Sequence, residues 1–176
     1  MNRCLRYALG VLVVLGTLVS SGVPSRGDDF EWRVYSSKIG RFTAKFPGEV
    51  TMKEMPNATH FSGSPPGLDA DFRVAFTDRK EADANFEASF KELKRIRDAT
   101  AESQKITLED EIDFLFAGLP ACKFHFDKDV GTVVARYQMV YIMDGKRFYQ
   151  LVVGYDVKMP LSAEAEKFVK SFRIER

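Results

Sequence analysis

Cysteine and histidine, the side chains that most often bind metals or carry covalent catalysis, are nearly absent from this sequence. The 176 residues include only two of each. Cys4 lies in an N-terminal segment that we expect to be cleaved off, which leaves Cys122 alone and excludes an intramolecular disulfide. His60 and His125 are isolated and show neither the HxH nor the HExxH spacing of zinc sites. This isolation favours structural or solvent-exposed roles for both histidines.

Catalytic and cofactor-binding motifs are also missing. The sequence contains no GxSxG nucleophile motif, no phosphate-binding loop and no GxGxxG, so we predict neither catalytic residues nor a cofactor. The weak metal candidates that remain are His60, His125, Asp127 and Asp129. The pattern Asp127-x-Asp129-x-Gly131 resembles the start of a calcium loop, but it lacks the downstream glutamate that such a loop needs. Asp and Gly at these positions are explained more simply by a turn.

Neither sign of charge is in excess. The chain has 26 Lys and Arg residues against 25 Asp and Glu residues, which gives a net charge of +1. This balance gives no reason to expect nucleic acid or an anionic membrane surface as a partner.

The one long apolar run lies at the N-terminus. Arg3 and Arg6 precede the uncharged segment ALGVLVVLGTLV, and the small residues Ser20-Ser21-Gly22 follow it, which is the pattern of a signal peptide. A membrane-spanning helix would need ~20 apolar residues. We therefore predict a signal peptide over residues 1–21, a flexible leader over 22–29 and a single domain over 30–176. The mature protein is expected in the periplasm or outside the cell, without stable insertion in a membrane.

The best-specified structure is a β-hairpin over residues 132–155, in which two runs rich in β-formers flank Met143-Asp144-Gly145. A two-residue loop of Asp144 and Gly145 would mix polar and apolar residues on both faces of the hairpin. A three-residue loop that includes Met143 places Met139 opposite Tyr149 and gives one continuous apolar face. We therefore predict the three-residue loop.

Alternating apolar residues predict further strands over residues 31–35, 41–46, 50–55, 71–77, 106–116 and 121–126. Residues 57–67 contain two glycines and two prolines and predict a loop or an irregular hairpin tip, and residues 127–131 predict a turn. The acidic centre Glu109-Asp110-Glu111 indicates an exposed or bulged part of its strand.

Two helices are predicted. Ala82, Phe86, Phe90, Leu93 and Ile96 recur at helical spacing within residues 81–99, and their apolar stripe should cover the sheet. A second helix is expected to begin with Ser162 as its N-cap and to bury Phe168 and Phe172. The predicted fold is α+β, with a central antiparallel sheet flanked by helices in an αβα sandwich.

Cys122 alternates with Phe124 and Phe126 on one strand, which predicts that it packs as a small apolar residue. His125 is three residues away and should therefore point to the opposite face, which argues against a Cys-His dyad.

The order of several segments resembles the PsbP-like exported proteins, which share a fold with the Ran-binding Mog proteins. The resemblance rests on the segment from Gly40 to Gly48 (GRFTAKFPG), on Gly118-Leu119-Pro120, on GKRFYQL at 145–151 and on FVKSF at 168–172. It spans residues 30 to 174 and implies a central antiparallel sheet flanked by helices. For activity it implies an accessory or binding protein, since the plant relatives assist the oxygen-evolving centre of photosystem II. No metal-binding or partner-binding residue of the family matches a position here.

Three functions are compatible with these features. The first is a non-enzymatic exported binding or accessory module that acts through a protein partner in the periplasm or cell envelope. The second is a carrier of a lipid or other apolar small molecule, with some of the 15 Phe residues lining a cleft, although the same residues would equally fill a core. The third and least favoured is a metal-dependent or hydrolytic enzyme centred on His60 or His125 with Asp127 and Asp129.

Overall fold

The computed structural model describes residues 31–65, 67, 69–159 and 161–175. The predicted signal peptide and the predicted leader both lie outside the described residues. In chain order the elements are β1 (Trp32–Ser37), β2 (Phe42–Pro47), β3 (Val50–Met55), β4 (Ala58–Gly63), β5 (Ala70–Asp78), α1 (Phe86–Gln104), β6 (Glu109–Phe116), β7 (Leu119–Val130), β8 (Val133–Asp144), β9 (Arg147–Asp156), α2 (Ser162–Ser171) and β10 (Arg173–Ile174).

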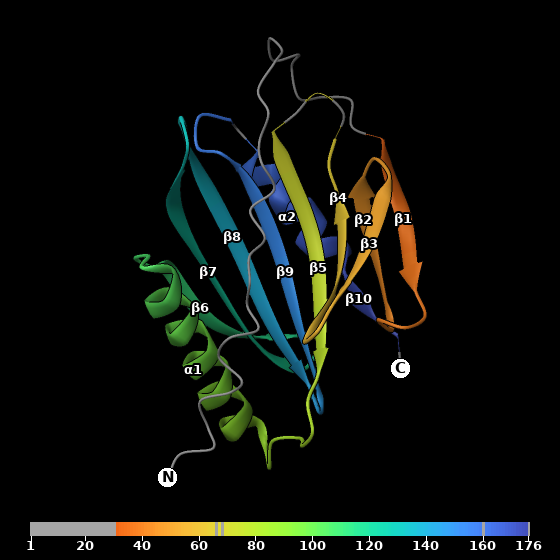
Figure 1. Ribbon diagram of the computed structural model, residues 1–176. Coiled ribbons are helices and arrows are strands. Elements are labelled where there is room, and N and C mark those ends of the chain that lie inside the picture. The colour runs from red at the N-terminus through yellow and green to blue at the C-terminus, as the bar shows by residue number, and fades with distance from the viewer. Residues whose placement is uncertain (1–30, 66, 68, 160, 176) are drawn as a thin grey trace.

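The strands form two antiparallel sheets (Figure 1). The large sheet has seven strands in the order β3-β4-β5-β9-β8-β7-β6, and the small sheet has three in the order β1-β2-β10. The last strand therefore pairs with one of the first, since Arg173 of β10 lies opposite Thr43 of β2.

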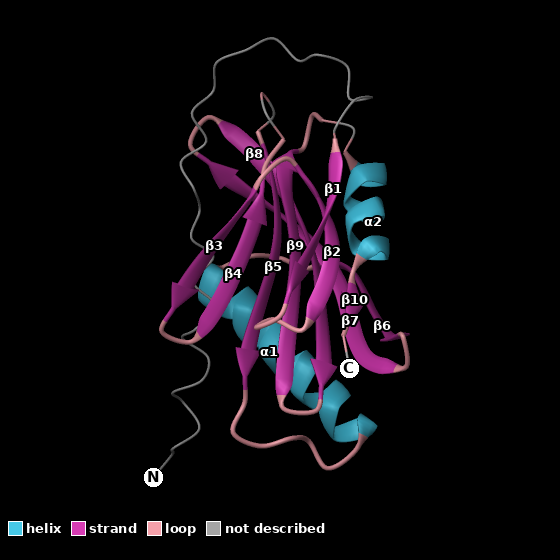
Figure 2. Ribbon diagram, turned by 90° about the vertical axis from the view of Figure 1, so that its right-hand side faces the viewer, coloured by secondary structure: helices cyan, strands magenta, loops and turns pink. Residues whose placement is uncertain are grey.

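The larger hydrophobic core lies between the two sheets, with α2 packed beside the small sheet (Figure 2). It is built largely from phenylalanine rings, for example Phe42 against Phe61 at 5.1 Å and Phe46 against Phe168 at 5.2 Å between ring centroids. Phe168 and Phe172 are both fully buried, which confirms the side of α2 that was predicted to face inward.

The second core lies on the other face of the large sheet, under α1. Leu93 of α1 is fully buried there, together with Cys122 and Phe124 of β7 and Tyr141 of β8. The expected contact between the helix and the sheet is confirmed for Phe90, Leu93 and Ile96. The first part of the predicted stripe is wrong, because Phe86 is exposed and Ala82 precedes the helix. Among the described residues, neither helix is long and apolar enough to cross a membrane.

The fold is thus a β-rich α+β fold built on a central antiparallel sheet, as predicted. The helices, however, do not form the two complete outer layers of the expected αβα sandwich. One face of the large sheet carries α1, whereas the other carries the small sheet with α2 beside it (Figures 1 and 2).

The predicted hairpin forms between β8 and β9, but the predicted register is wrong. The turn consists of only Gly145 and Lys146, so that Met139 lies opposite Val152 rather than Tyr149. The predicted register was chosen because it gave the hairpin one continuous apolar face. Both faces of this hairpin are buried, by α1 on one side and by the core between the sheets on the other, so apolar residues on both faces are the correct pattern.

Several predicted boundaries also need correction. The segment over 57–67, predicted as a loop or an irregular hairpin tip, contains strand β4. The turn predicted over 127–131 belongs mostly to β7, where Asp127 forms a cross-strand ion pair with Arg136. Helix α1 begins five residues later than predicted, because the Asn85 side chain caps it by accepting a hydrogen bond from the Ala88 amide. Ser162 is the first residue of α2 rather than its N-cap. The exposed or bulged part predicted at Glu109-Asp110-Glu111 is confirmed, since these residues are exposed and the β6–β7 register shifts between Glu109 and Ile112.

Polar contacts fix α1 on the β6–β7–β8 half of the sheet. The Arg97 guanidinium is buried and lies 2.8 Å from Glu111 and 3.1 Å from Asp98. Thr100 lies within hydrogen-bonding distance of the Tyr141 hydroxyl, at 3.3 Å. The helix therefore covers one half of this face of the sheet.

Candidate functional site

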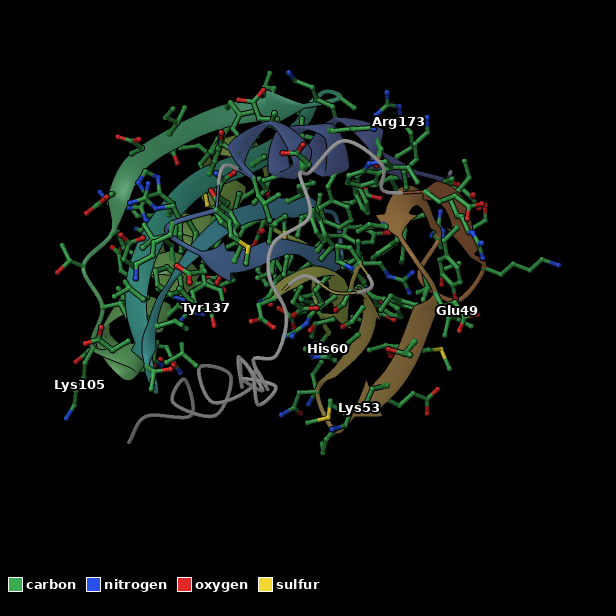
Figure 3. The ribbon with its side chains drawn as sticks, turned by 90° about the horizontal axis from the view of Figure 1, so that it is seen from above. Glu49, Lys53, His60, Lys105, Tyr137 and Arg173 are labelled. Atoms are coloured by element: carbon green, nitrogen blue, oxygen red, sulfur yellow. The ribbon has the colours of Figure 1, made fainter. Side chains whose placement is uncertain are left out.

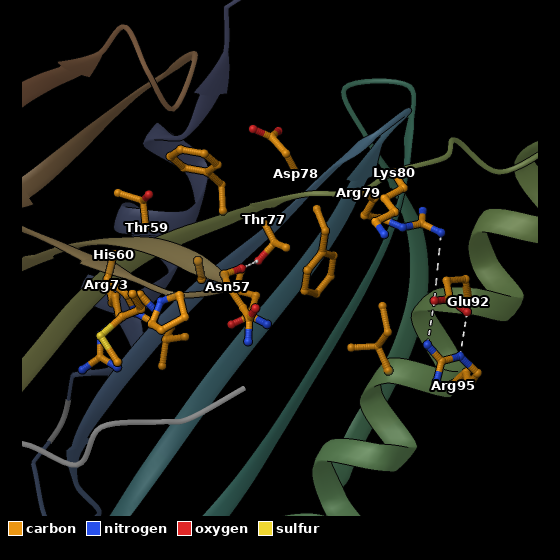
Figure 4. A pocket seen from close by; sticks show the side chains of 18 of the residues that line it. Asn57, Thr59, His60, Arg73, Thr77, Asp78, Arg79, Lys80, Glu92 and Arg95 are labelled. Carbon is orange, nitrogen blue, oxygen red and sulfur yellow. Dashed lines mark hydrogen bonds and ion pairs between the residues drawn. The ribbon is translucent and has the colours of Figure 1, made fainter. Parts of the chain in front are cut away.

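A groove of about 760 Å³ lies beside α1, over strands β4, β5 and β9 (Figure 4). Its floor comes from the sheet and is partly apolar, with Phe148 and Val152 of β9 buried at its base. Ile96 of α1 adds an apolar side chain to one wall, and Met55 adds another on the opposite wall. The side of the groove away from the sheet is open to solvent. A bound group would therefore contact the floor and both walls and leave its outer side in water.

The wall opposite α1 is the turn between β3 and β4. Asn57 in this turn is exposed, and its carbonyl accepts a hydrogen bond of 2.9 Å from the Thr77 hydroxyl of β5. This bond ties the turn to the sheet. The wall is therefore held in place by a hydrogen bond between the turn and strand β5.

The rim on the α1 side is built from paired charges. Glu92 of α1 lies 2.7 Å from Arg95 and 4.0 Å from Arg79, and Arg79 also pairs with Asp83 at 2.8 Å. Hydrogen bonding to Asp83 raises the pKa of Arg79, so its guanidinium stays charged. Lys80, next to this network, is exposed and has no partner among the residues that the structure describes.

At the other end of the groove, His60 and Arg73 belong to the lining, and Lys53 lies beside them on the edge strand β3. Lys53 of β3 lies directly opposite His60 of β4, and Arg73 of β5 lies opposite Ser62, the next residue of β4 on the same face. Figure 3 shows Lys53 and His60 on the same side of the curved sheet as Tyr137, with Arg173 on the other side. Burial lowers the pKa of His60, and the positive charges of Arg73 and Lys53 lower it further. Its imidazole is therefore neutral at pH 7.

Among the described residues, Asp71 is the only carboxylate paired with this basic group. Its side chain bonds one terminal nitrogen of Arg73, whose Nε donates to the Ser62 hydroxyl at 3.3 Å. Burial raises the pKa of Asp71, against the opposing effect of Arg73. Neither Lys53 nor His60 has a hydrogen-bond or ion-pair partner among the described residues.

The four residues named as metal candidates are not brought together. His60 lies on β4, and the other three lie on β7, four strands away across the large sheet, or about 19 Å at the usual strand spacing. His125 Nε2 is 3.0 Å from Glu109, and Asp127 is bound through both oxygens by Arg136, which lowers the pKa of the Asp127 carboxyl. Asp129 is exposed near the end of β7.

Within the described part of the chain, no group of three or more His, Cys, Asp or Glu side chains is placed to hold a metal ion. Cys122 is fully buried and faces away from His125, as the alternation along β7 predicted. Burial raises the pKa of its thiol to about 12.

Sequence reasoning did not find this groove. Its basic end depends on β4, which was predicted as a loop or an irregular hairpin tip, and on Lys53 and Arg73, which were not singled out. Its floor comes from a register of β9 that was predicted incorrectly. Residues 58–63 carry little strand signal of their own, because Ala58 and Phe61 stand three residues apart and do not alternate with polar residues.

No protein-family model matches the sequence, and no curated protein matches it. Among solved structures, the chain is similar to CyanoP, the cyanobacterial PsbP of Synechocystis sp. PCC 6803, with a TM-score of 0.58 and 12% identity over 90% of this chain and 99% of that chain. It is also similar to a protein of Bacteroides thetaiotaomicron VPI-5482, with a TM-score of 0.51 and 12% identity over 81% of this chain. The match covers 48% of that chain, so the present chain spans about half its length.

A third structure, PA94 of Pseudomonas aeruginosa, is described as a protein of unknown function and putative regulator, and gives a TM-score of 0.48 at 14% identity over 82% of this chain and 97% of that chain. Neither the CyanoP description nor that of the Bacteroides protein names an enzymatic activity. At such low identity the likeness to CyanoP and to the Bacteroides protein concerns the fold alone. The chain has a PsbP-like fold.

Proposed function

We propose that this protein is a non-enzymatic accessory module that acts outside the cytoplasm by binding a partner protein in the groove between α1 and the β3–β4 turn. The observation that carries the proposal is the groove itself. It combines an apolar floor at Phe148 and Val152 with side chains such as His60 and Lys80 that have no partner among the described residues. Such side chains remain available to a ligand.

The shape of the groove favours a segment of a protein over an enclosed small molecule. Small-molecule sites commonly bury 70–90% of the ligand surface. This groove has an exposed rim, with Asn57 and Pro56 on one side and Lys80 and Arg95 on the other. An extended segment can lie along it and leave one side in water.

A carrier of apolar molecules receives less support. The phenylalanines that were expected to line a cleft mostly fill the core between the two sheets, where they pack against one another. Among the described phenylalanines, only Phe76 and Phe148 border the groove.

The lining also supports a binding role over catalysis. It contains neither serine nor cysteine among the described residues. Its one histidine, His60, has basic neighbours and no carboxylate that would orient it as a general base. The described lining therefore offers no serine or cysteine nucleophile for a base to activate.

Export is part of this proposal and rests on residues 1–21, whose pattern is that of a signal peptide. Amino-terminal sequencing of the protein recovered from its own host should give a chain that begins near residue 22, in the fraction outside the cytoplasm. A chain that begins at Met1 in the cytoplasm would contradict this part of the proposal. The kinship with Mog proteins remains a prediction from the sequence.

The function can be tested by photo-crosslinking in the host. A photoreactive amino acid replaces Lys80 at the groove rim in one variant and Lys45 of β2 in the control. Both lysines are exposed, but Lys80 lies in the loop after β5, whereas Lys45 lies in the small sheet. We expect a discrete protein adduct from position 80 that is absent from position 45. The adduct should disappear when Gln150 on the groove floor is replaced by tryptophan, which fills the groove. Equal adducts at both positions, or none, would contradict the proposal.

A further inference from the structure

The basic end of the groove is a cluster of positive charge on three neighbouring strands of one sheet face. Lys53 and His60 are directly opposite each other, a position at which side chains on the same face lie about 5 Å apart at Cβ. Arg73 is diagonal to His60 on the next strand. An anion placed among these three side chains would be within reach of all of them.

In the part of the chain that the structure describes, one carboxylate, that of Asp71, pairs with the cluster, and Lys53 has no ion-pair partner. On β3, Glu54 alternates with Lys53 and points to the opposite face. On β5, Asp71 bonds one nitrogen of Arg73, and on β9 the nearest polar residue, Gln150, is uncharged. On α1, Glu92 is held by Arg79 and Arg95 at the far rim.

The second feature is the apolar surface that continues from this cluster. His60 lies opposite Ala75 of β5, which in turn lies opposite Gln150 of β9. Arg73 of β5 lies opposite Val152 of β9. Phe148 lies two residues before Gln150 on the same face of β9. A ligand with a carboxylate next to apolar groups would thus match the groove along its length.

We propose that the groove recognises an acidic segment of the partner protein, in which one Asp or Glu carboxylate lies among Lys53, His60 and Arg73 and a neighbouring apolar side chain lies on Phe148 and Val152. This inference rests on the proposed function, because it names the chemistry of the segment that the groove would hold. A free organic acid could offer the same carboxylate. The open groove with polar rims on both sides favours the peptide.

Binding of this kind is coupled to protonation of His60. In the unbound protein, burial and the positive charges of Arg73 and Lys53 disfavour the charged imidazole of His60. A bound carboxylate would offset their charge and accept a hydrogen bond from the imidazolium, so the pKa of His60 should rise on binding. Affinity should then increase from pH 8 to pH 6 and decrease with added salt.

The experiment is a selection of random peptides displayed on phage against the protein produced in its own host, followed by affinity measurements with the best synthetic peptide. The selected peptides should share an Asp or Glu beside an apolar residue. Changing that residue to Asn or Gln, or changing Lys53→Glu in the protein, should weaken binding at pH 6 at least tenfold, the loss expected for a charge-assisted hydrogen bond. Lys45→Glu carries the same charge change on an exposed lysine of the small sheet and should bind as the wild type does.

Three results would overturn the inference: peptides without a shared carboxylate, equal binding by the Lys53→Glu variant, or a selection that yields no peptide. Decanoate serves as the probe for a free organic acid. If decanoate binds at the same site and the selected peptides do not compete with it, the peptide assignment is wrong. A groove that crosslinks a partner but shows no carboxylate requirement would refute this inference and leave the proposed function standing.

Discussion

Cys122 lies under α1 beside Phe124 and Tyr141, and it is fully buried. Burial raises the pKa of its thiol to about 12, so the reactive thiolate is scarce at ordinary pH. In a Cys4→Ser background we expect Cys122 to react with a thiol reagent at pH 8 only as fast as the protein unfolds. Labelling in 8 M urea gives the rate of the free thiol as a control. Rapid labelling of the folded protein would show that the core under α1 opens to solvent.

His60 should make stability sensitive to acid. Burial and two basic neighbours lower its pKa in the folded protein below 6.5, the value of the free side chain. As the pH falls below that value, the unfolded chain binds a proton that the folded chain does not, so the free energy of unfolding decreases. The His60→Gln variant should lose less stability than the wild type between pH 7.5 and pH 5. Urea unfolding at both pH values measures this, and an equal loss in both proteins would contradict it.

At the scale of elements, the β8–β9 turn depends on Gly145, whose φ of 57° lies in the left-handed region. A β-branched residue is strained there, so Gly145→Val should destabilise the protein by roughly 1–2 kcal/mol. Lys146→Val at the second turn position, where φ is not positive, is the matched control and should change stability by less than about 0.5 kcal/mol. Chemical denaturation gives both values. Equal effects would show that backbone conformation does not limit this turn.

The attachment of α1 depends on Arg97, which joins the helix to β6 through Glu111. Replacing Arg97 by Ala removes the buried guanidinium and leaves carboxylates that are partly exposed and can be hydrated again. We expect a loss of about 1–3 kcal/mol in the free energy of unfolding. Lys94→Ala, an exposed position on the same helix, should be nearly neutral. A neutral Arg97→Ala variant would mean that apolar contacts such as those of Leu93 hold the helix alone.

Much of this element structure follows from the sequence, because most strands have a regular apolar alternation and α1 has a clear apolar stripe. The opposite orientations of Cys122 and His125 follow from the same alternation, and the bulge near Asp110 follows from its acidic surroundings. The hairpin register did not follow, because it depends on how many faces of the sheet are covered. That is a tertiary property, and residues on both faces of β8 and β9 proved to be apolar.

The groove was beyond sequence reasoning for a related reason. Lys53, His60 and Arg73 come from three strands, and their proximity exists only in the correct pairing of β3, β4 and β5. The glycines and prolines that follow β4 concealed that strand. Once β4 is assigned as a strand, the alternation places His60 and Ser62 on one face.

At the scale of the whole molecule, the core between the sheets should make the two sheets unfold together. Trp32 of β1, the only tryptophan, packs edge to face on Phe72 of β5 at 5.5 Å between ring centroids. Its fluorescence therefore reports contact between the sheets, whereas circular dichroism at 222 nm reports secondary structure of the whole chain. We expect the two urea transitions to coincide. An earlier fluorescence transition would show that the small sheet detaches independently.

The small sheet also joins the two ends of the described chain. Thr43 of β2 bonds Glu175, which is 132 positions later, and β10 pairs with β2 beside this bond. A ribosome releases β1 and β2 early, but the strand and helix that complete their surroundings are synthesised last. The phenylalanine-rich core therefore cannot close until translation is nearly finished, and contacts between such distant residues form slowly. A nascent chain of this design stays open for almost the whole of its synthesis, and in that interval chaperones can bind it.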